Sequence, residues 1–290
     1  MGLKDDIERC YELLQAAERI LIGAGAGLSA AAGLDYTDKE AFTRDYPALV
    51  KKGFTMKAEL IGFMNWSPEE MWGYWAQHIN DFRFKWSPHP VYTKLLDLVQ
   101  KKDYFVLTSN VDAMFVKSGF SEERIFTPQG DYALMQCLKP CSNQTWPIKP
   151  IIDRILPYID KATQTVTDSN LIPYCPNCGG SVFPNVRGGN WFVEEPYKQQ
   201  QKRFSDWIKK QKDQQLIVIE IGSGFNTPVV VRWQMEQIVY HYKSAHLVRV
   251  NTQYPQIPEE ITDRSLSFQC NAKLFVSALW EINEKRKNES

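Results

Sequence analysis

The chain lacks net charge and has no long hydrophobic run. Its 34 basic and 34 acidic side chains cancel in the formal count, so no electrostatic footprint for nucleic acid or for an anionic membrane is visible. No apolar run approaches the roughly 18 residues that a membrane span needs. Residues 1–6 lack the apolar stretch of a secretory leader, and Asp6 breaks the myristoylation pattern. We therefore expect a cytoplasmic protein that binds neither nucleic acid nor membrane.

Histidines are also few. His78, His89, His241 and His246 are scattered, and none of them adjoins a cysteine pair or a Ser/Asp set. A nucleophilic catalytic triad therefore has no support in this sequence.

Four of the six cysteines form two close pairs. Cys137 and Cys141 make the first pair, and Cys175 and Cys178 make the second. Four thiolates form a closed tetrahedral site for Zn²⁺, which has a structural role because no coordination position stays open. Disulfides are rare in a reducing compartment. We expect a structural zinc site, and reduced cysteines without metal are the alternative.

Apolar runs of strand length alternate with helical patterns along most of the chain. The runs lie at residues 19–22, 104–107, 216–219 and 247–250. This alternation is typical of βαβ units with a parallel sheet. It predicts an α/β fold with a doubly wound, Rossmann-like parallel sheet and a smaller module.

The smaller module has two parts. Residues 39–90 are rich in aromatic side chains at helical spacing, and we expect a helical module with those rings in its core. Residues 130–195 contain both cysteine pairs and predict a zinc-binding module. The Rossmann-like domain then comprises residues 1–38, 91–129 and 196–290.

A glycine-rich loop follows the first predicted strand. The run from Gly25 to Ala30 reads G-A-G-L-S-A and fits the pattern G-x-G-x-x-G/A. Its glycines let the backbone approach a pyrophosphate, and the next helix offers free N–H groups. Close packing is the alternative reason for small residues there. The acidic residue expected about 20 positions later on a strand is missing, because Asp45 has a helical context. An ordinary dehydrogenase is therefore disfavoured.

Four further stretches occur in a fixed order behind this loop. Residues 108–112 read T-S-N-V-D, residues 175–180 read C-P-N-C-G-G before F-P-N-V at 183–186, residues 222–224 read G-S-G, and Val250 precedes Asn251. With the glycine-rich run, which is similar to GAG-I-S-x-x-S-G-I, they resemble the signature motifs of the sirtuins, the NAD-consuming deacylases. The resemblance spans about residues 19–252 and implies a sirtuin fold with NAD as co-substrate.

The resemblance also implies which residues contact NAD. Asn110 and Asp112 would line the ribose and nicotinamide pocket, and Asn251 would contact the adenosine part. For Asn110 and Asp112 the alternative is an Asn-x-Asp turn at a strand end. The implied cofactor-binding residues are Gly25, Ala26, Gly27, Ser29, Asp35, Asn110, Asp112, Gln129, Gly222, Ser223 and Asn251.

Three departures separate this chain from the deacylases. Gln129 stands where they carry a histidine general base, residues 35–38 read D-Y-T-D in place of P-D-F-R, and residues 189–194 replace the F-G-E of the peptide cleft. Together these departures resemble the divergent, macrodomain-associated (class M) sirtuins. That resemblance implies protein ADP-ribosyltransferase activity.

Gln129 discriminates between two reactions, because an amide takes up no proton near neutral pH. Deacylation needs a base, whose help is worth about 10²–10⁴-fold in rate. Capture of the ribose by an ionised acceptor needs positioning instead. We expect Asn110, Gln129 and Arg187 to be catalytic, with the Arg187 guanidinium orienting an acceptor or a phosphate. The alternatives are a surface loop position for Arg187 and a structural amide in an inert NAD site for Gln129.

The function expected from the sequence is NAD-dependent mono-ADP-ribosylation of a protein, with release of nicotinamide. The resemblance implies a lipoylated carrier of the glycine cleavage H type as acceptor, and a macrodomain hydrolase that reverses the modification. Two alternatives stay open. One is an NAD-dependent lysine deacylase that uses Gln129 or water, and the other is a catalytically silent NAD-sensing interaction module.

Overall fold

The computed structural model describes residues 3–210 and 214–289. Met1 and Gly2 lie outside the described residues, and part of the expectation about a secretory leader rests on them. Ser290, the last residue of the predicted Rossmann-like domain, also lies outside them. In the described part of the chain, no helix combines the length and the apolar character needed to cross a bilayer.

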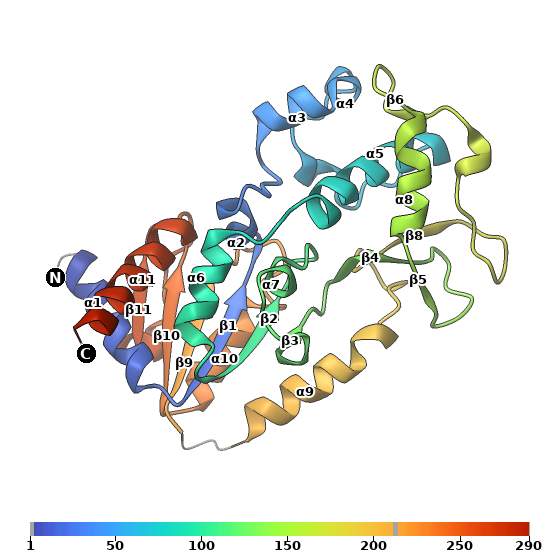
Figure 1. Cartoon of the computed structure of the whole chain (residues 1–290). Helices are drawn as coiled ribbons and strands as arrows, with labels where there is room; N and C mark the ends of the chain where they lie inside the picture. The colour runs from blue at the N-terminus through green and yellow to red at the C-terminus, as the bar shows by residue number, and fades with distance from the viewer. Residues whose placement is uncertain (1–2, 211–213, 290) are drawn as a thin grey trace. The chain divides into compact units, whose positions relative to one another are not determined.

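The chain divides into two compact units (Figure 1). The larger unit consists of Met1–Leu34, Ser87–Gln129 and Tyr197–Ser290. The smaller unit consists of Asp35–Trp86 and Gly130–Pro196.

The larger unit is built on a six-stranded sheet whose order is β11-β10-β9-β1-β2-β3. Every neighbouring pair in this sheet is parallel. The predicted doubly wound α/β fold is thus confirmed. The strands are β1 (Arg19–Ala24), β2 (Asp103–Thr108), β3 (Ile125–Phe126), β9 (Leu216–Ile221), β10 (Ala245–Val250) and β11 (Ser265–Phe268).

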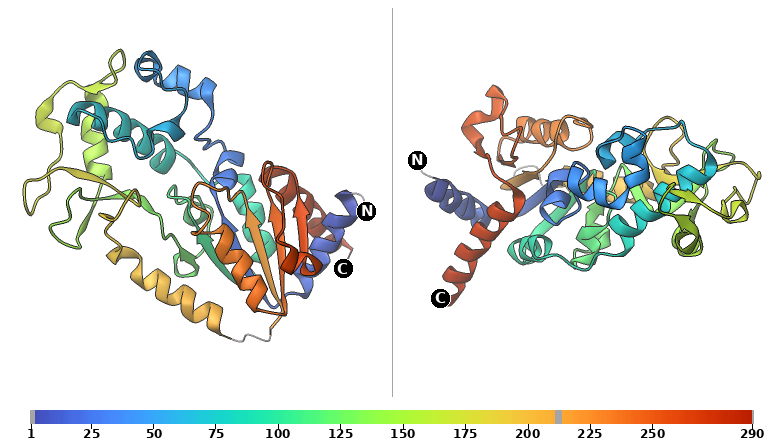
Figure 2. Two further views of the ribbon diagram at one scale, coloured as in Figure 1. Left: turned by 180° about the vertical axis from the view of Figure 1, so that it is seen from behind. Right: turned by 90° about the horizontal axis from the view of Figure 1, so that it is seen from above.

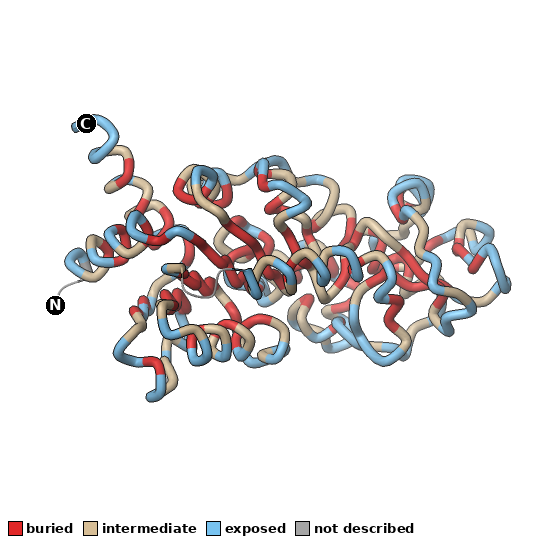
Figure 3. Tube along the Cα trace, turned by 90° about the horizontal axis from the view of Figure 1, so that it is seen from below, coloured by how far each residue is buried: buried red, intermediate tan, exposed pale blue. Residues whose placement is uncertain are grey.

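Helices cover both faces of this sheet (Figure 2). Helices α1, α6 and α11 pack together on one face, whereas on the other α9 contacts β2 and β3, and α10 contacts β9 and β10. All residues of β1 and β9 are buried as a result, which explains their continuous apolar runs. Figure 3 colours the trace by burial and shows buried stretches in red and exposed ones in pale blue. The helices are α1 (Leu3–Ala16), α2 (Ala26–Ala31), α6 (Pro90–Val99), α7 (Met114–Lys117), η3 (Glu122–Arg124), α9 (Lys198–Lys209), α10 (Arg232–His241), η7 (Glu259–Arg264) and α11 (Ala272–Asn288).

The strand order reverses at β1, which pairs with β2 on one side and with β9 on the other. In open parallel sheets, ligands bind outside the carboxyl ends of the strands at such a reversal. The loops that follow β1, β2, β9 and β10 therefore lie where a ligand is expected to bind.

The smaller unit combines helices with a separate antiparallel sheet of order β5-β4-β8. The rings of Trp72, Tyr74 and Trp75 on α5 are buried, as expected for a core stripe. Its strands are β4 (Gly130–Cys137), β5 (Thr145–Pro147), β6 (Ile159–Asp160), β7 (Thr165–Val166) and β8 (Val182–Val186). Its helices are α3 (Lys39–Asp45), α4 (Pro47–Lys51), η1 (Lys57–Leu60), α5 (Pro68–Ile79), η2 (Asn80–Phe84), α8 (Lys149–Ile155), η4 (Leu156–Tyr158) and η5 (Ser169–Leu171), and η6 (Glu195–Tyr197) joins the two units in the sequence.

Candidate functional site

The glycine-rich loop after β1 packs directly against the loop after β9. Gly25 N donates to Ile221 O at 2.9 Å, and Gly27 N donates to Gly222 O at 3.0 Å. A Cβ atom on Gly25 would lie 2.6 Å from Gly222 O, and one on Gly27 would lie 2.7 Å from Gly222 Cα. Gly222 itself has a φ of 70°, which disfavours other residues. Glycines on both sides therefore let the two loops touch.

A second group of predicted residues meets at the carboxyl ends of β1 and β2. Asn110 Nδ2 donates to Gly25 O at 2.9 Å, and the Ser29 hydroxyl donates to the Asp112 carboxylate. Asp112 Oδ1 also accepts a hydrogen bond from Met114 N at 2.9 Å, in a short turn after the strand. Ser29, Asn110 and Asp112 are all buried. This group is thus rigidly tied to the glycine-rich loop.

Ser223 and Asn251 meet at the ends of β9 and β10. Asn251 Nδ2 donates to Ser223 O at 2.8 Å, and its Oδ1 accepts from Gln253 N at 3.0 Å and Tyr254 N at 2.9 Å. The Ser223 hydroxyl is buried and lacks a hydrogen-bond partner among the described residues. A buried polar group left without a partner costs about 1–3 kcal/mol. The Ser223 hydroxyl is therefore suited to a polar ligand.

Gln129 ends the part of the larger unit that follows β3. Its Oε1 is buried without a hydrogen-bond partner in the described part of the chain. Thr127 lies two residues before Gln129 and donates twice to Gln200 Oε1 on α9, from its backbone N at 2.9 Å and from its Oγ1 at 3.1 Å. The segment that leads to Gln129 is therefore fixed, and the side-chain amide oxygen of Gln129 is available as a hydrogen-bond acceptor.

Two predicted residues, Asp35 and Arg187, belong to the smaller unit. Asp35 Oδ1 accepts from the backbone N and the hydroxyl of Thr37, both at 2.7 Å, and so closes a local turn. Arg187 pairs with Glu194 at 2.5 Å, and its Cζ lies 4.5 Å from the ring centroid of Phe192. Its side chain is 37% exposed. Arg187 is thus oriented by an acid and a ring while part of its surface still meets solvent.

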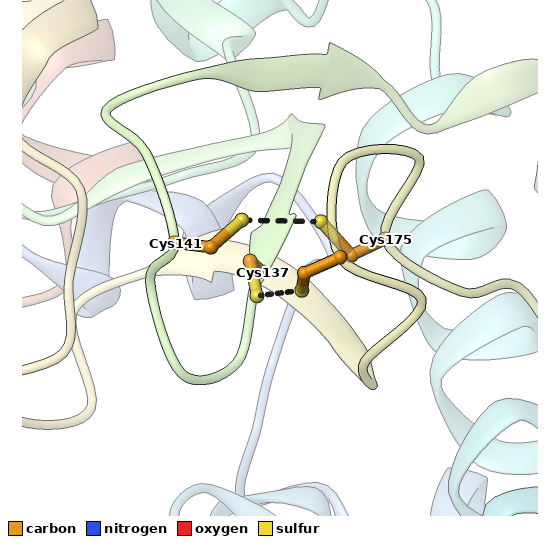
Figure 4. Close-up of side chains that lie close together, drawn as sticks. Cys137, Cys141 and Cys175 are labelled. Atoms are coloured by element: carbon orange, nitrogen blue, oxygen red, sulfur yellow. Dashed lines mark hydrogen bonds between the residues drawn. The ribbon is translucent and has the colours of Figure 1, made fainter.

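The four predicted zinc ligands converge in the smaller unit (Figure 4). Their sulfur atoms all lie within 4.8 Å of one another, with 3.7 Å between Cys137 and Cys178 and 3.6 Å between Cys141 and Cys175. Four thiolates at about 2.3 Å from Zn²⁺ stand roughly 3.8 Å apart in a tetrahedron, whereas a disulfide joins sulfurs at about 2.05 Å. The cluster fits a structural zinc ion.

A buried charge network beneath the β9 and β10 loops was not predicted from the sequence. Glu220 and Arg249 are register partners on these strands, both fully buried, and Arg249 Nε donates to Glu220 Oε2 at 2.5 Å. Arg249 Nη2 also lies 2.7 Å from Glu236 Oε1 on α10. The sequence does hold a signal for this pair, because Glu220 and Arg249 are each the second-last residue of an apolar strand.

Comparison with known proteins finds relatives that are similar to this chain over most of its length. No protein-family model matches the chain. It is 38% identical over 264 residues, 88% of its length, to a probable bifunctional ADP-ribose hydrolase/ADP-ribosyltransferase from Fusarium oxysporum f. sp. cubense, and it spans only 44% of that protein. It is 28% identical over 276 residues to a protein ADP-ribosyltransferase from Staphylococcus aureus, which covers 91% of this chain and 85% of that protein.

Solved structures share the fold. A Sir2 homologue in complex with NAD superposes with a TM-score of 0.64 at 16% identity, covering 96% of this chain and 94% of its own. A mutant Sir2 homologue in complex with ADP-ribose gives a TM-score of 0.62 at 16% identity, covering 98% of both chains. At this identity the likeness establishes the fold alone.

Proposed function

We propose that this chain is a divergent sirtuin of the ADP-ribosyltransferase type, which transfers ADP-ribose from NAD to a protein and releases nicotinamide. The observation that carries this proposal is Gln129, which by the sirtuin resemblance stands where the deacylases have a basic histidine. Its buried Oε1 has no partner among the described residues, so it can accept a hydrogen bond but cannot take up the proton.

The loops at the strand reversal fit the dinucleotide. Gly25, Gly27 and Gly222 leave the backbone bare where a pyrophosphate would approach, and Ser223 offers an unpartnered hydroxyl. In our proposal Asn110 and Asp112 face the nicotinamide half, as the sirtuin resemblance implies. NAD supplies the ADP-ribosyl group, and nicotinamide leaves as the acceptor's nucleophilic atom bonds to the ribose carbon.

Transfer to a protein acceptor requires little proton movement if the acceptor is already ionised. A carboxylate bonds to the ribose carbon without losing a proton, so positioning replaces base catalysis. We assign the positioning of the ribose to Asn110 and Gln129. We assign that of the acceptor or a phosphate to Arg187, whose guanidinium is held by Glu194 and Phe192.

For the acceptor we propose a lipoylated carrier of the glycine cleavage H type. This choice rests on the resemblance to class M sirtuins and not on a contact in the structure. We also propose that a hydrolase reverses the modification. The Fusarium relative supports this pairing, because its name combines ADP-ribose hydrolase with ADP-ribosyltransferase.

The test is the intact mass of the lipoylated carrier after incubation with the protein and NAD. We expect a gain of one ADP-ribose unit, no gain with the unlipoylated carrier, and a strongly reduced gain with Gln129→Ala. Gln100→Ala is the matched control, because Gln100 is an exposed glutamine of the same unit at the end of α6. It should transfer at the rate of the unsubstituted protein.

Other outcomes select the alternatives. Loss of acyl groups from lysine peptides, with no mass gain on any protein, would identify a deacylase. NAD binding without release of nicotinamide, in the presence of the carrier, would identify a silent NAD-sensing module.

A further inference from the structure

Arg232 adds to the Asn251–Ser223 hydrogen bond in connecting the two loops that follow β9 and β10. Arg232 opens α10, and its side chain is only 3% exposed. Arg232 Nη1 donates to Tyr254 O at 3.0 Å and, more weakly, to Ser223 O at 3.5 Å. Arg232 Nη2 donates to Gln256 O at 3.1 Å. One planar guanidinium therefore holds the backbone of both loops at the carboxyl edge of the sheet.

The guanidinium is itself held by the buried charge network. Arg232 Nε lies 3.6 Å from Glu236 Oε1, and the same oxygen lies 2.7 Å from Arg249 Nη2. Arg249 continues to Glu220 at 2.5 Å and also donates to Gln256 O. Two arginines and two glutamates alternate, so their formal charges cancel. Such a network fixes the direction of each side chain, since removing one charge would leave another buried without its partner.

Above the guanidinium lies an exposed aromatic pair. Arg232 Cζ stands 4.6 Å from the ring centroid of Phe225. The rings of Phe225 and Tyr254 meet edge to face, with centroids 5.0 Å apart. Phe225 is 51% exposed and Tyr254 is 38% exposed. Each loop supplies one ring, and Arg232 helps to keep the two loops together.

We propose that Arg232 is a positioning residue for the adenosine half of NAD. It helps to set the distance between the loops that carry Ser223 and Asn251, and it supports the ring of Phe225, which meets Tyr254 edge to face, as the surface on which the purine stacks. This inference rests on the proposed function, because it needs NAD as the ligand. In the proposed function the reacting end of NAD faces Asn110, Asp112 and Gln129, whereas Arg232 donates its hydrogen bonds to the loops after β9 and β10. Arg232 therefore governs affinity and leaves the chemical step alone.

The chain offers a matched control for this arginine. Arg264 Nη1 donates to Val239 O at 2.8 Å, Tyr242 O at 3.0 Å and Ala245 O at 3.1 Å. Those carbonyls lie at the end of α10 and the start of β10, at the opposite edge of the sheet from the nucleotide loops. Arg264 thus has the same structural task as Arg232 without access to the proposed site.

The first comparison uses Arg232→Lys and Arg264→Lys. Lysine keeps the charge but presents one nitrogen in place of the fork, so it cannot hold three carbonyls. We expect Arg232→Lys to raise the Kd of ADP-ribose and the KM for NAD about tenfold, the effect of losing a charged hydrogen bond. Its kcat at saturating NAD should stay within about twofold. Arg264→Lys should lower the melting temperature similarly and leave Kd and KM unchanged.

A second comparison avoids any cost in folding. Phe225→Ala changes an exposed ring, and Tyr240→Ala changes a ring on α10 that is 45% exposed. Stacking of a base on an aromatic side chain is worth a factor of about ten or more in affinity. Phe225→Ala should therefore weaken ADP-ribose binding about tenfold without lowering the melting temperature, and Tyr240→Ala should not weaken it.

Titration calorimetry with ADP-ribose, together with steady-state kinetics in NAD, separates the outcomes. An unchanged Kd in both Arg232→Lys and Phe225→Ala would overturn this inference while leaving the proposed function intact. A fall in kcat with an unchanged KM in Arg232→Lys would overturn it too. If the unsubstituted protein binds neither ADP-ribose nor NAD, the proposed function fails and this inference fails with it.

Discussion

His78 makes the stability of the smaller unit depend on pH. The residue lies on α5 with its side chain fully buried, and its ring stacks on Phe82 with centroids 4.4 Å apart. His78 Nε2 lies 3.1 Å from the Tyr132 hydroxyl, and Nδ1 lies 3.4 Å from that of Tyr74. Burial, assisted by the positive charge of Lys57, lowers the pKa of His78 from 6.5 to about 3.

The sign and size of the effect follow from this depressed pKa. Below pH 6.5 the unfolded chain binds a proton at His78 that the folded protein does not bind. The stabilising contribution is therefore complete above the unfolded pKa of about 6.5 and is lost as the pH falls toward 3. Each pH unit in that window costs about 1.4 kcal/mol. Between pH 7 and pH 5, His78 alone should remove about 2 kcal/mol from the free energy of unfolding.

Urea unfolding at pH 7 and pH 5 measures this contribution in His78→Phe. Phenylalanine fills similar space and loses the tyrosine contacts at both pH values, so only the proton linkage differs. The unsubstituted protein should lose about 2 kcal/mol more than the variant between the two pH values. His241→Phe, at an exposed position, is the control and should behave like the unsubstituted protein. Equal losses in His78→Phe and the unsubstituted protein would refute the reasoning.

Three further predictions concern the metal, the nucleotide loop and the buried charges. Native mass spectrometry should find one zinc ion per chain, and Cys141→Ser should abolish it and lower the melting temperature; protein that holds no zinc when purified with it would contradict the assignment. Gly25→Ala should weaken NAD binding at least tenfold, because its methyl group would press on Gly222 O at 2.6 Å; an unchanged Kd in calorimetry would contradict this close approach. Glu220→Gln should cost about 3–5 kcal/mol in urea unfolding, since it removes a charge from a fully buried pair with Arg249; a loss below about 1 kcal/mol would contradict the network.

Much of the sheet can be predicted from the sequence, because burial on both faces leaves continuous apolar runs. Strands β1, β2, β9 and β10 carry such runs. Strands β3 and β11 escape prediction because they have 2 and 4 residues, too few for a periodic signal. The sheet β5-β4-β8 could not be predicted from the sequence either, since the pairing of β4 with β8 shifts register between Gly130 and Met135. Its alternation is therefore interrupted within one strand.

The site is predictable as a set of residues but not as a set of contacts. The resemblance groups Asn110 and Asn251 with the glycine-rich loop and residues 222–224 in one expected NAD site. The structure adds that the Asn110 amide donates to Gly25 O and the Asn251 amide to Ser223 O. Such bonds depend on strand register, which a single sequence leaves open. The Glu220–Arg249 pair was missed for the same reason.

The central claim is that NAD serves to modify a protein and not to remove an acyl group. The most direct measurement is the ratio of nicotinamide released to ADP-ribose gained by the lipoylated carrier, with an acyl-lysine peptide present in the same reaction. The account predicts a ratio near one, with the peptide unchanged. Nicotinamide release that matches loss of acyl groups from the peptide, with no ADP-ribose on the carrier, would contradict it.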